Sequence, residues 1–172
     1  MQDLLIEGGA GAPAMSVGAG GVLRISNFML QSAAASVIDV GGGKLMLEDS
    51  NVSGSGGVGL RLHSGGQATI KRSVLCRCAQ HGLMITASSR ASVVSSSIFE
   101  NGSHGVVTSM QRSHVDMKHC MVSFNGGVGV FVDQEAGARV EDNDLRNNTK
   151  GPHAIAPASH TLVSISKNLT TA

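Results

Sequence analysis

The side chains with the clearest chemical potential lie in the last third of the chain. Asp142 and Asp144 are two positions apart, and His119 precedes Asp142 by 23 residues. In an extended strand such a pair shares one face, with roughly 6.5–7 Å between backbone positions. The two carboxylates and the histidine could form an acid–base pair or a weak oxygen-ligand Ca²⁺ site. The alternative is a solvated acidic patch that stacks with Lys118 and Arg139.

Two histidines form the other candidate constellation. His81 and His104 are also 23 residues apart, and each stands just before a glycine. Two imidazoles without a third ligand do not make a zinc site, so we expect a stacked pair at a turn and no metal.

The cysteines bear on the compartment. Cys76, Cys78 and Cys120 are odd in number, and an i,i+2 pair in a strand is too far apart for an ordinary disulfide. Free thiols indicate a reducing compartment, and residues 1–7 lack the basic start and apolar stretch of an export signal. We therefore expect a cytoplasmic protein, and a secreted or surface-exposed one is the alternative.

Composition excludes two classes of protein. The net charge is +1 with scattered basic residues, and aromatic residues make up 2% of the 172 positions. No basic stripe suits a nucleic acid, and no apolar run is long enough to span a membrane. We expect one domain, residues 1–172, with a narrow aliphatic core.

The elements that position these side chains are repeats. A glycine before a short apolar run recurs at steps of 23, 23 and 24 residues, and a fifth, degenerate copy follows 23 residues later; the positions are Gly59, Gly82, Gly105, Gly129 and Pro152. A fixed period of this size is typical of a solenoid. Alternating apolar residues on both sides of each glycine predict three strands per repeat. The sequence therefore predicts an all-β, single-stranded parallel β-helix of about seven coils of 22–24 residues.

The outer coils are expected to be incomplete. Residues 1–21 are interpreted as a partial first coil and residues 161–172 as a partial last coil. No stretch shows helical periodicity, so no capping helix is expected and the ends should be open to partners or self-association.

One polar column is expected to point inward. Asn101, Asn125 and Asn148 recur at steps of 24 and 23 residues, continuing a column with Ser55 and Cys78. Asparagines in register can pass amide hydrogen bonds between coils, as in cross-β stacks. We interpret this column as a structural ladder without a catalytic role.

The outer surface carries charges and one apolar stripe. Opposite charges one period apart should stack in register; the expected pairs are Glu48/Lys71, Arg77/Glu100, Asp116/Arg139, Lys118/Glu141 and Asp39/Arg61. Two positions after the repeat glycines, an outward column contains Met84, Val107, Phe131 and Ala154. Such a stripe predicts a surface for a protein partner, although the chain's own terminal segment could cover it.

The pattern N-x-x-x-G-hydrophobic-x-hydrophobic, with A-x-V-x-x-N-x-hydrophobic-x-x-N over residues 138–148, resembles a known repeat. It is similar to the right-handed parallel β-helix of the pectate-lyase-like superfamily, and more narrowly to carbohydrate-binding and sugar-hydrolase type repeats found in some F-box proteins. The resemblance covers about residues 21–165 and implies fold more than activity.

Two functions remain open from the sequence. We favour a non-catalytic scaffold or protein-interaction module within a larger protein or assembly. The alternative is a carbohydrate-active enzyme, either a polysaccharide lyase or a glycoside hydrolase, or a carbohydrate-binding module that takes a glycan. If the chain is an enzyme, Asp142, Asp144 and His119 are the candidate catalytic residues.

Overall fold

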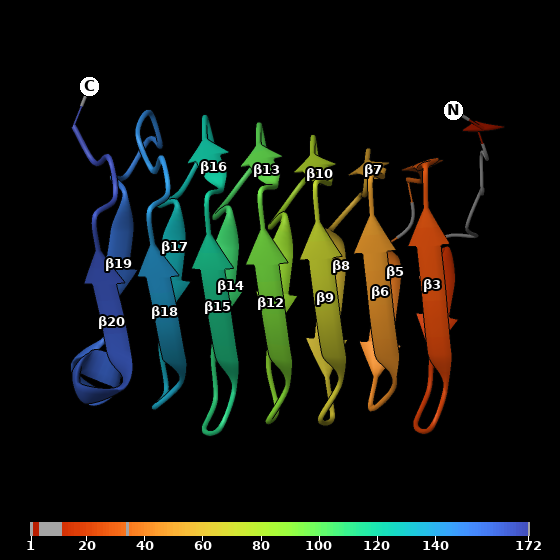
Figure 1. Ribbon diagram of the computed structural model, residues 1–172, viewed down its shortest axis with the longest axis horizontal. Coiled ribbons are helices and arrows are strands. Elements are labelled where there is room, and N and C mark those ends of the chain that lie inside the picture. The colour runs from red at the N-terminus through yellow and green to blue at the C-terminus, as the bar shows by residue number, and fades with distance from the viewer. Residues whose placement is uncertain (1, 4–11, 34, 172) are drawn as a thin grey trace.

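The architecture was obtained as a computed structural model, which describes residues 2–3, 12–33 and 35–171. Twenty strands and one short helix form a stack of coils, coloured from red to blue along its axis in Figure 1. The strands contribute to three parallel sheets, two of seven strands and one of six. The expected β-helix of about seven coils with three strands in most coils is confirmed.

The first sheet contains the strands that follow the repeat glycines. Its order is β19-β17-β14-β11-β8-β5-β2. The bounds are β2 Met15–Val17, β5 Ser36–Gly41, β8 Val58–His63, β11 Leu83–Ile85, β14 Val106–Thr108, β17 Val130–Val132 and β19 His153–Ile155.

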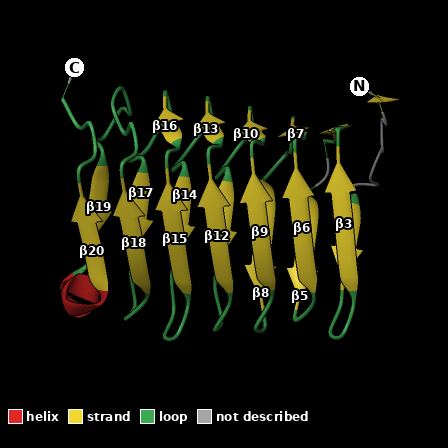
Figure 2. Cartoon of the chain, viewed as in Figure 1, coloured by secondary structure: helices red, strands yellow, loops and turns green. Residues whose placement is uncertain are grey.

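The second sheet faces the viewer in Figures 1 and 2, and its order is β20-β18-β15-β12-β9-β6-β3. The bounds are β3 Val22–Ser26, β6 Lys44–Glu48, β9 Gln67–Lys71, β12 Arg90–Val94, β15 His114–Lys118, β18 Gly137–Glu141 and β20 Val163–Ser166.

The third sheet is the shortest, with the order β1-β4-β7-β10-β13-β16. The bounds are β1 Gln2–Asp3, β4 Phe28–Gln31, β7 Asn51–Ser53, β10 Val74–Cys76, β13 Ser97–Phe99 and β16 Met121–Ser123. Isolated bridges from Met121 to Asp144 and from Asp144 to Leu169 continue it.

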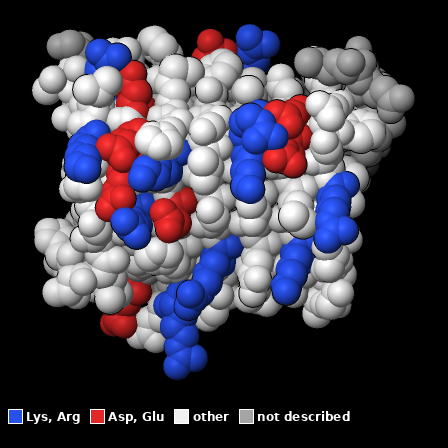
Figure 3. All heavy atoms as spheres, viewed as in Figure 1, with Lys and Arg blue, Asp and Glu red and all other residues white. Residues whose placement is uncertain are grey.

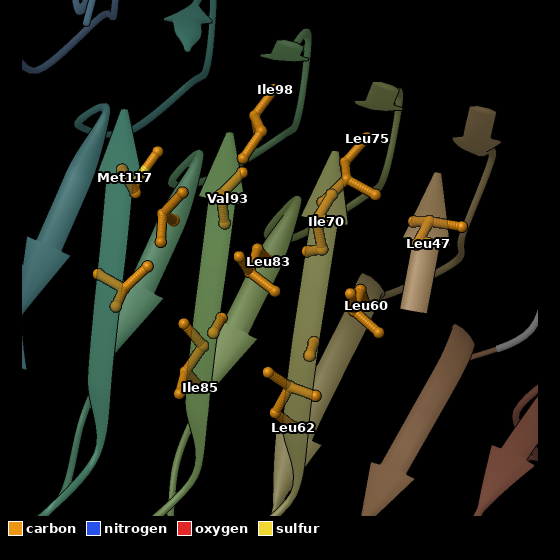
Figure 4. Packing of buried hydrophobic residues seen from close by; sticks show 14 of the residues in the cluster. Leu47, Leu60, Leu62, Ile70, Leu75, Leu83, Ile85, Val93, Ile98 and Met117 are labelled. Atoms are coloured by element: carbon orange, nitrogen blue, oxygen red, sulfur yellow. The ribbon is translucent and has the colours of Figure 1, made fainter. Parts of the chain in front are cut away.

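The core is a narrow column of aliphatic side chains between the sheets, as Figure 4 shows. Most of the described strands present alternate residues inward, because a strand has a side-chain period of two. The twelve largest fully buried side chains are all Leu, Ile or Met. The expected inward columns are buried except at the outer coils, where Leu23, His153 and Ile155 are partly exposed.

Thr108 is the polar exception within that core. It is fully buried, and its Oγ1 has no hydrogen-bond partner. Its register partners on β11 and β17 are Ile85 and Val132, so an aliphatic column surrounds one unsatisfied hydroxyl.

Most coils turn twice through a corner that holds one residue in the left-handed region. Between the second and third sheets these residues are Asn27, Asp49, Arg72, Ser95, His119, Asp142 and Lys167, with φ from 46° to 60°. Between the third and first sheets they are Gly54, Arg77, Glu100, Phe124 and Asn147. His119 and Asp142 therefore lie one above the other, because each occupies the second-to-third corner of its own coil.

The arc between the first and second sheets is the variable part of the coil. Val40 and Leu45 are five positions apart, Leu62 and Ala68 six, and Thr108 and Val115 seven. In contrast, the inward residues on either side of the second-to-third corner are five apart in every coil, from Ile25 and Leu30 to Val140 and Leu145. Differences in coil length are confined to the arc.

The outer coils differ from expectation in one respect. Pro157–Leu162 forms a 3-10 helix between β19 and β20, although the sequence showed no helical segment. A single six-residue segment is too short to display a helical period, and Pro157 at its first turn was the available signal. β20, Val163–Ser166, lies within the expected partial last coil, while residues 1 and 4–11 of the expected partial first coil lie outside the described residues.

Candidate functional site

The carboxylate constellation expected from the sequence is brought together on the surface. His119, Asp142 and Asp144 line one shallow depression of about 470 Å³, beside Lys167 and Leu169. Asp142 and Asp144 both point outward because Asn143 between them points into the core, where it is buried. The predicted proximity of these three residues is therefore confirmed.

Both carboxylates are engaged by cations. Arg146 donates two hydrogen bonds to Asp144, at 2.9 Å from Nε to Oδ1 and 2.8 Å from its terminal nitrogen to Oδ2. Lys118 Nζ lies 3.6 Å from Asp142 Oδ2. The hydrogen bonds from Arg146 lower the pKa of Asp144 below its usual range. Asp144 is thus a charged partner of an arginine and a poor proton donor near neutral pH.

A metal ion at this depression would compete with these pairs. Within the described residues, no three His, Cys, Asp or Glu side chains are grouped as metal ligands. Ca²⁺ prefers six to eight oxygen ligands, and binding here would require Lys118 and Arg146 to leave the carboxylates.

The two histidines form a stack with an aromatic ring from a third coil. The ring centroids of His81 and His104 are 5.4 Å apart, and those of His104 and Phe131 are 5.0 Å apart. The backbone N–H of His104 donates to His81 Nδ1 at 3.3 Å, and that of Val128 donates to His104 Nδ1 at 3.0 Å. Burial lowers the pKa of both imidazoles, so they stack as neutral rings. The expected stacked pair is confirmed.

The outer apolar stripe is less exposed than the sequence suggested. Val107 is only 6% exposed, while Met84, Phe131 and Ala154 are partly buried. The expectation that all four lie open to solvent is wrong for Val107. Its outward neighbours are large, and Phe131 stacks on His104 beside it. The role of the stripe in binding a partner stays a prediction.

The asparagine ladder has the expected geometry. Asn101 Nδ2 donates to Asn125 Oδ1 at 2.9 Å, and Asn125 Nδ2 donates to Asn148 Oδ1 at 2.9 Å. The Oδ1 atom of each asparagine also accepts a hydrogen bond from the backbone N–H one coil earlier. These N–H groups belong to Cys78, Asn101 and Asn125 and donate to Asn101, Asn125 and Asn148 in that order. The side chains hold the corner that follows the left-handed residue, which is a structural role.

A second ladder at the other corner was not predicted. Asn143 Nδ2 donates to Asn168 Oδ1 at 3.0 Å, and the N–H of Cys120 donates to Asn143 Oδ1 at 2.8 Å. Three earlier coils use serine: the N–H of Ser50 donates to Ser73 Oγ at 3.2 Å, and the N–H of Ser73 donates to Ser96 Oγ at 3.2 Å. The available signal was the recurrence of small polar residues at Ser50, Ser73, Ser96, Cys120, Asn143 and Asn168.

The stacked charges follow the register, but only part of the expected pairing. Arg61–Asp39 at 2.5 Å and Arg77–Glu100 at 3.1 Å are confirmed. The other three expected pairs are register partners whose ion pairs go elsewhere; Glu48 binds Arg72, Lys118 binds Asp142, and Arg139 binds Glu141. A long, exposed side chain can reach several oppositely charged neighbours, so the backbone register alone does not decide which ion pair forms.

All three thiols are free and buried. Burial raises the pKa of Cys78 to about 11 and that of Cys76 and Cys120 above the usual thiol range. Such thiols are weak nucleophiles near neutral pH. Among the described residues, no helix is long and apolar enough to cross a membrane.

Comparison with known proteins agrees with the architecture. A solved structure, the periplasmic alginate epimerase AlgG, superposes with a TM-score of 0.65 at 12% identity over 87% of this chain. The match spans 42% of AlgG, and at this identity the likeness shows the fold alone. No curated protein matches this sequence. The family model for the right-handed β-helix region matches residues 15–168. The chain therefore belongs to the right-handed β-helix family.

Proposed function

We propose that this β-helix is a non-catalytic binding module. The observation that carries the proposal is the pairing of both candidate carboxylates, Asp142 with Lys118 and Asp144 with Arg146. A glycosidase needs one carboxyl that stays protonated as the general acid and a second that works as base or nucleophile. The Arg146 hydrogen bonds act in the opposite direction on Asp144, since they favour its charged form.

The other titratable groups point the same way. His81 and His104 use Nδ1 to hold backbone N–H groups, so this nitrogen is engaged in the fold. The three thiols are buried with raised pKa values, which is unlike an activated nucleophile. The rigid stack of coils suits display of a fixed surface.

Partner binding through the outer stripe belongs to this proposal. Met84, Phe131 and Ala154 present apolar surface around buried Val107 on neighbouring strands of the first sheet. The partner would be a protein or a second copy of this chain. Replacing Met84 by Lys and Ala154 by Lys should abolish association in sedimentation velocity while the unfolding midpoint is kept. Phe131 is left in place because its ring supports His104.

A carbohydrate-active function is the second candidate. The observation in its favour is the similarity to AlgG, an alginate epimerase by name, across most of this chain. A glycan-binding module would satisfy both proposals, whereas catalysis would satisfy only this one.

Turnover of polyuronates by the purified chain separates the two candidates. We expect no product and no change with Asp142→Asn or Asp144→Asn. The matched control is Asp116→Asn, an exposed aspartate on β15. Turnover that Asp142→Asn abolishes and Asp116→Asn leaves intact would overturn the non-catalytic proposal.

A cytoplasmic location is also proposed, supported by three unpaired cysteines. AlgG is periplasmic by its name, which favours the opposite compartment. Fractionation of the native cells followed by immunoblotting distinguishes the two.

A further inference from the structure

A second hollow lies at the edge of the molecule where the arcs between the first and second sheets meet. Its volume is about 560 Å³, and its lining includes Arg90, Arg112, His114, Glu135 and Leu162. This size falls within the range of small-molecule sites. It lies at the start of β12, β15 and β18 and shares no residue with the depression around Asp142.

The repeat places the basic side chains together. Arg90 begins β12 and His114 begins β15, and the two are register partners on adjacent strands. Arg112 stands two residues before His114, in the arc between Thr108 and Val115. Its backbone is in the left-handed region, with φ 63°. In Figure 3, a basic group projects at the lower edge of this face beside a single acidic one, whereas charges of both signs interleave on the left.

Arg90 and Arg112 differ from five of the other six arginines of the chain, the exception being Arg24 at the far end of the sheet. Five arginines hold a carboxylate within 4.0 Å, namely Arg61, Arg72, Arg77, Arg139 and Arg146. Among the described residues, no acidic side chain lies within that distance of Arg90 or Arg112. Two guanidinium groups in one hollow therefore have free hydrogen-bond donors.

Glu135 does not neutralise this pair. Its Oε2 accepts a hydrogen bond from Gln111 Nε2, which holds the carboxylate at the side of the hollow. Two guanidinium groups and one carboxylate leave the hollow with a net positive charge. The charge arrangement thus favours an anionic ligand.

The rest of the hollow gives room for the body of a ligand. Gly137 is the register partner of His114, and a Cβ there would lie 2.7 Å from His114 Nδ1 and 3.2 Å from the Leu162 carbonyl oxygen. The missing side chain lets the His114 ring and the Leu162 carbonyl approach this closely. Leu162, which ends the 3-10 helix, is 49% exposed and supplies an apolar wall.

We propose that this hollow binds a monocarboxylate ligand the size of one or two sugar rings. Arg90 and Arg112 take the carboxylate, because a planar guanidinium pairs with a carboxylate through two parallel hydrogen bonds. Leu162 packs against the ligand's body, which a small anion such as acetate or phosphate lacks. The site goes beyond the proposed function, since it assigns a ligand class and position that hold for either catalytic outcome.

The test is titration of the whole ¹⁵N-labelled chain with glucuronate, glucose, acetate and inorganic phosphate. We expect glucuronate to shift amides of residues 111–114 and 135–137 in a saturable manner. Glucose lacks the carboxylate and acetate lacks the body, so both should bind at least about tenfold more weakly. Phosphate should also bind more weakly than glucuronate.

Arg90→Gln and Arg112→Gln should each weaken glucuronate binding about tenfold or more. The matched control is Arg24→Gln, an exposed arginine at the far end of the same sheet, which should change nothing. The unfolding midpoints of all three variants should equal that of the parent chain. Absent shifts, equal binding of glucose, tighter binding of phosphate, or binding insensitive to both variants would each overturn the proposal. Turnover of polyuronates would overturn only the non-catalytic function.

Discussion

Asn125 is the residue where the ladder can be tested most sharply. Its side chain is 0% exposed and makes four hydrogen bonds. Nδ2 donates to Asn148 Oδ1 at 2.9 Å and to the Ile98 carbonyl at 3.2 Å. Oδ1 accepts from the N–H of Asn101 at 3.1 Å and from Asn101 Nδ2 at 2.9 Å.

Asn125→Ala removes all four bonds, but the loss is uneven. Asn101 Nδ2 keeps the Leu75 carbonyl at 3.4 Å, and Asn148 Oδ1 keeps the N–H of residue 125 at 3.1 Å. The Asn101 N–H loses the acceptor that satisfies it, and an unsatisfied buried donor costs about 1–3 kcal/mol. With the net loss of the remaining bonds, we expect about 3 kcal/mol of destabilisation.

Asn148→Ala should be milder. Its side chain is partly exposed, so water can replace the lost groups, and we expect about 1 kcal/mol. Asn51→Ala is the control, a partly exposed asparagine on β7 outside both ladders, with an expected change within about 0.5 kcal/mol.

The assay is urea unfolding followed by far-ultraviolet circular dichroism, since the chain has no Trp or Tyr for fluorescence. For a domain of this size, 3 kcal/mol also corresponds to a fall in Tm of about 6–12 °C. The slope of the free energy with urea should be unchanged. Equal losses for Asn125 and Asn148, or a loss at Asn125 no larger than at Asn51, would refute the reasoning.

Four further predictions follow from single positions. Gly105→Ala should destabilise the fold by about 3 kcal/mol or more, because its Cβ would clash with Val122 Cγ1 and lie 2.8 Å from the Gly129 carbonyl oxygen. Scanning calorimetry measures the loss, and Gly18→Ala, which has open space around its Cβ, is the control. Thr108→Val should stabilise by about 1–2 kcal/mol, because it removes the unsatisfied buried hydroxyl, whereas Thr108→Ser should destabilise; a loss with Val would show that the hydroxyl is bonded. Phe124→Asn should raise stability by about 1 kcal/mol, because the residue is 62% exposed and its left-handed backbone, at φ 55°, is one that asparagine adopts more easily. Phe124→Ala keeps the backbone strain and should give no gain. Stability should fall as the pH drops below about 6.5, because His81, His104 and His114 have pKa values lowered by burial and the unfolded chain takes up protons first. His81→Gln with His104→Gln should reduce that slope between pH 5 and 7 and leave the part due to His114; an unchanged slope would contradict the assignment.

The sequence carried most of the fold because the backbone pattern is repeated and local. Alternation on both sides of the repeat glycines placed Leu60 and Leu62 inside and Arg61 outside, and each coil gave the same result independently. Asparagine is chemically distinctive, so Asn101, Asn125 and Asn148 could be recognised as a column. The second ladder escaped because serine and cysteine fill its first positions, and those residues recur in many other contexts.

The site was harder to predict because it depends on side-chain choices. Register placed Lys118 opposite Glu141, yet the amine reaches Asp142, since both carboxylates lie within range of a flexible chain. Val107 points outward as expected but is covered by its large neighbours, which a strand pattern does not reveal. The hollow at Arg90 and Arg112 joins an arc to a strand end, so no fixed spacing in the sequence indicated it.

The contrast between the constant corners and the variable arc has a consequence for how such a chain can diversify. Both ladders require a fixed residue count around their corners, so an insertion there would put every later coil out of register. The arcs between the first and second sheets already differ by up to two residues between coils, and the last contains a helical turn instead. Foreign loops grafted between Gln111 and Arg112 should therefore be tolerated, whereas the same grafts between Phe124 and Asn125 should not. Ligand preference can thus change in the arcs while the stack that supports them keeps its length and order.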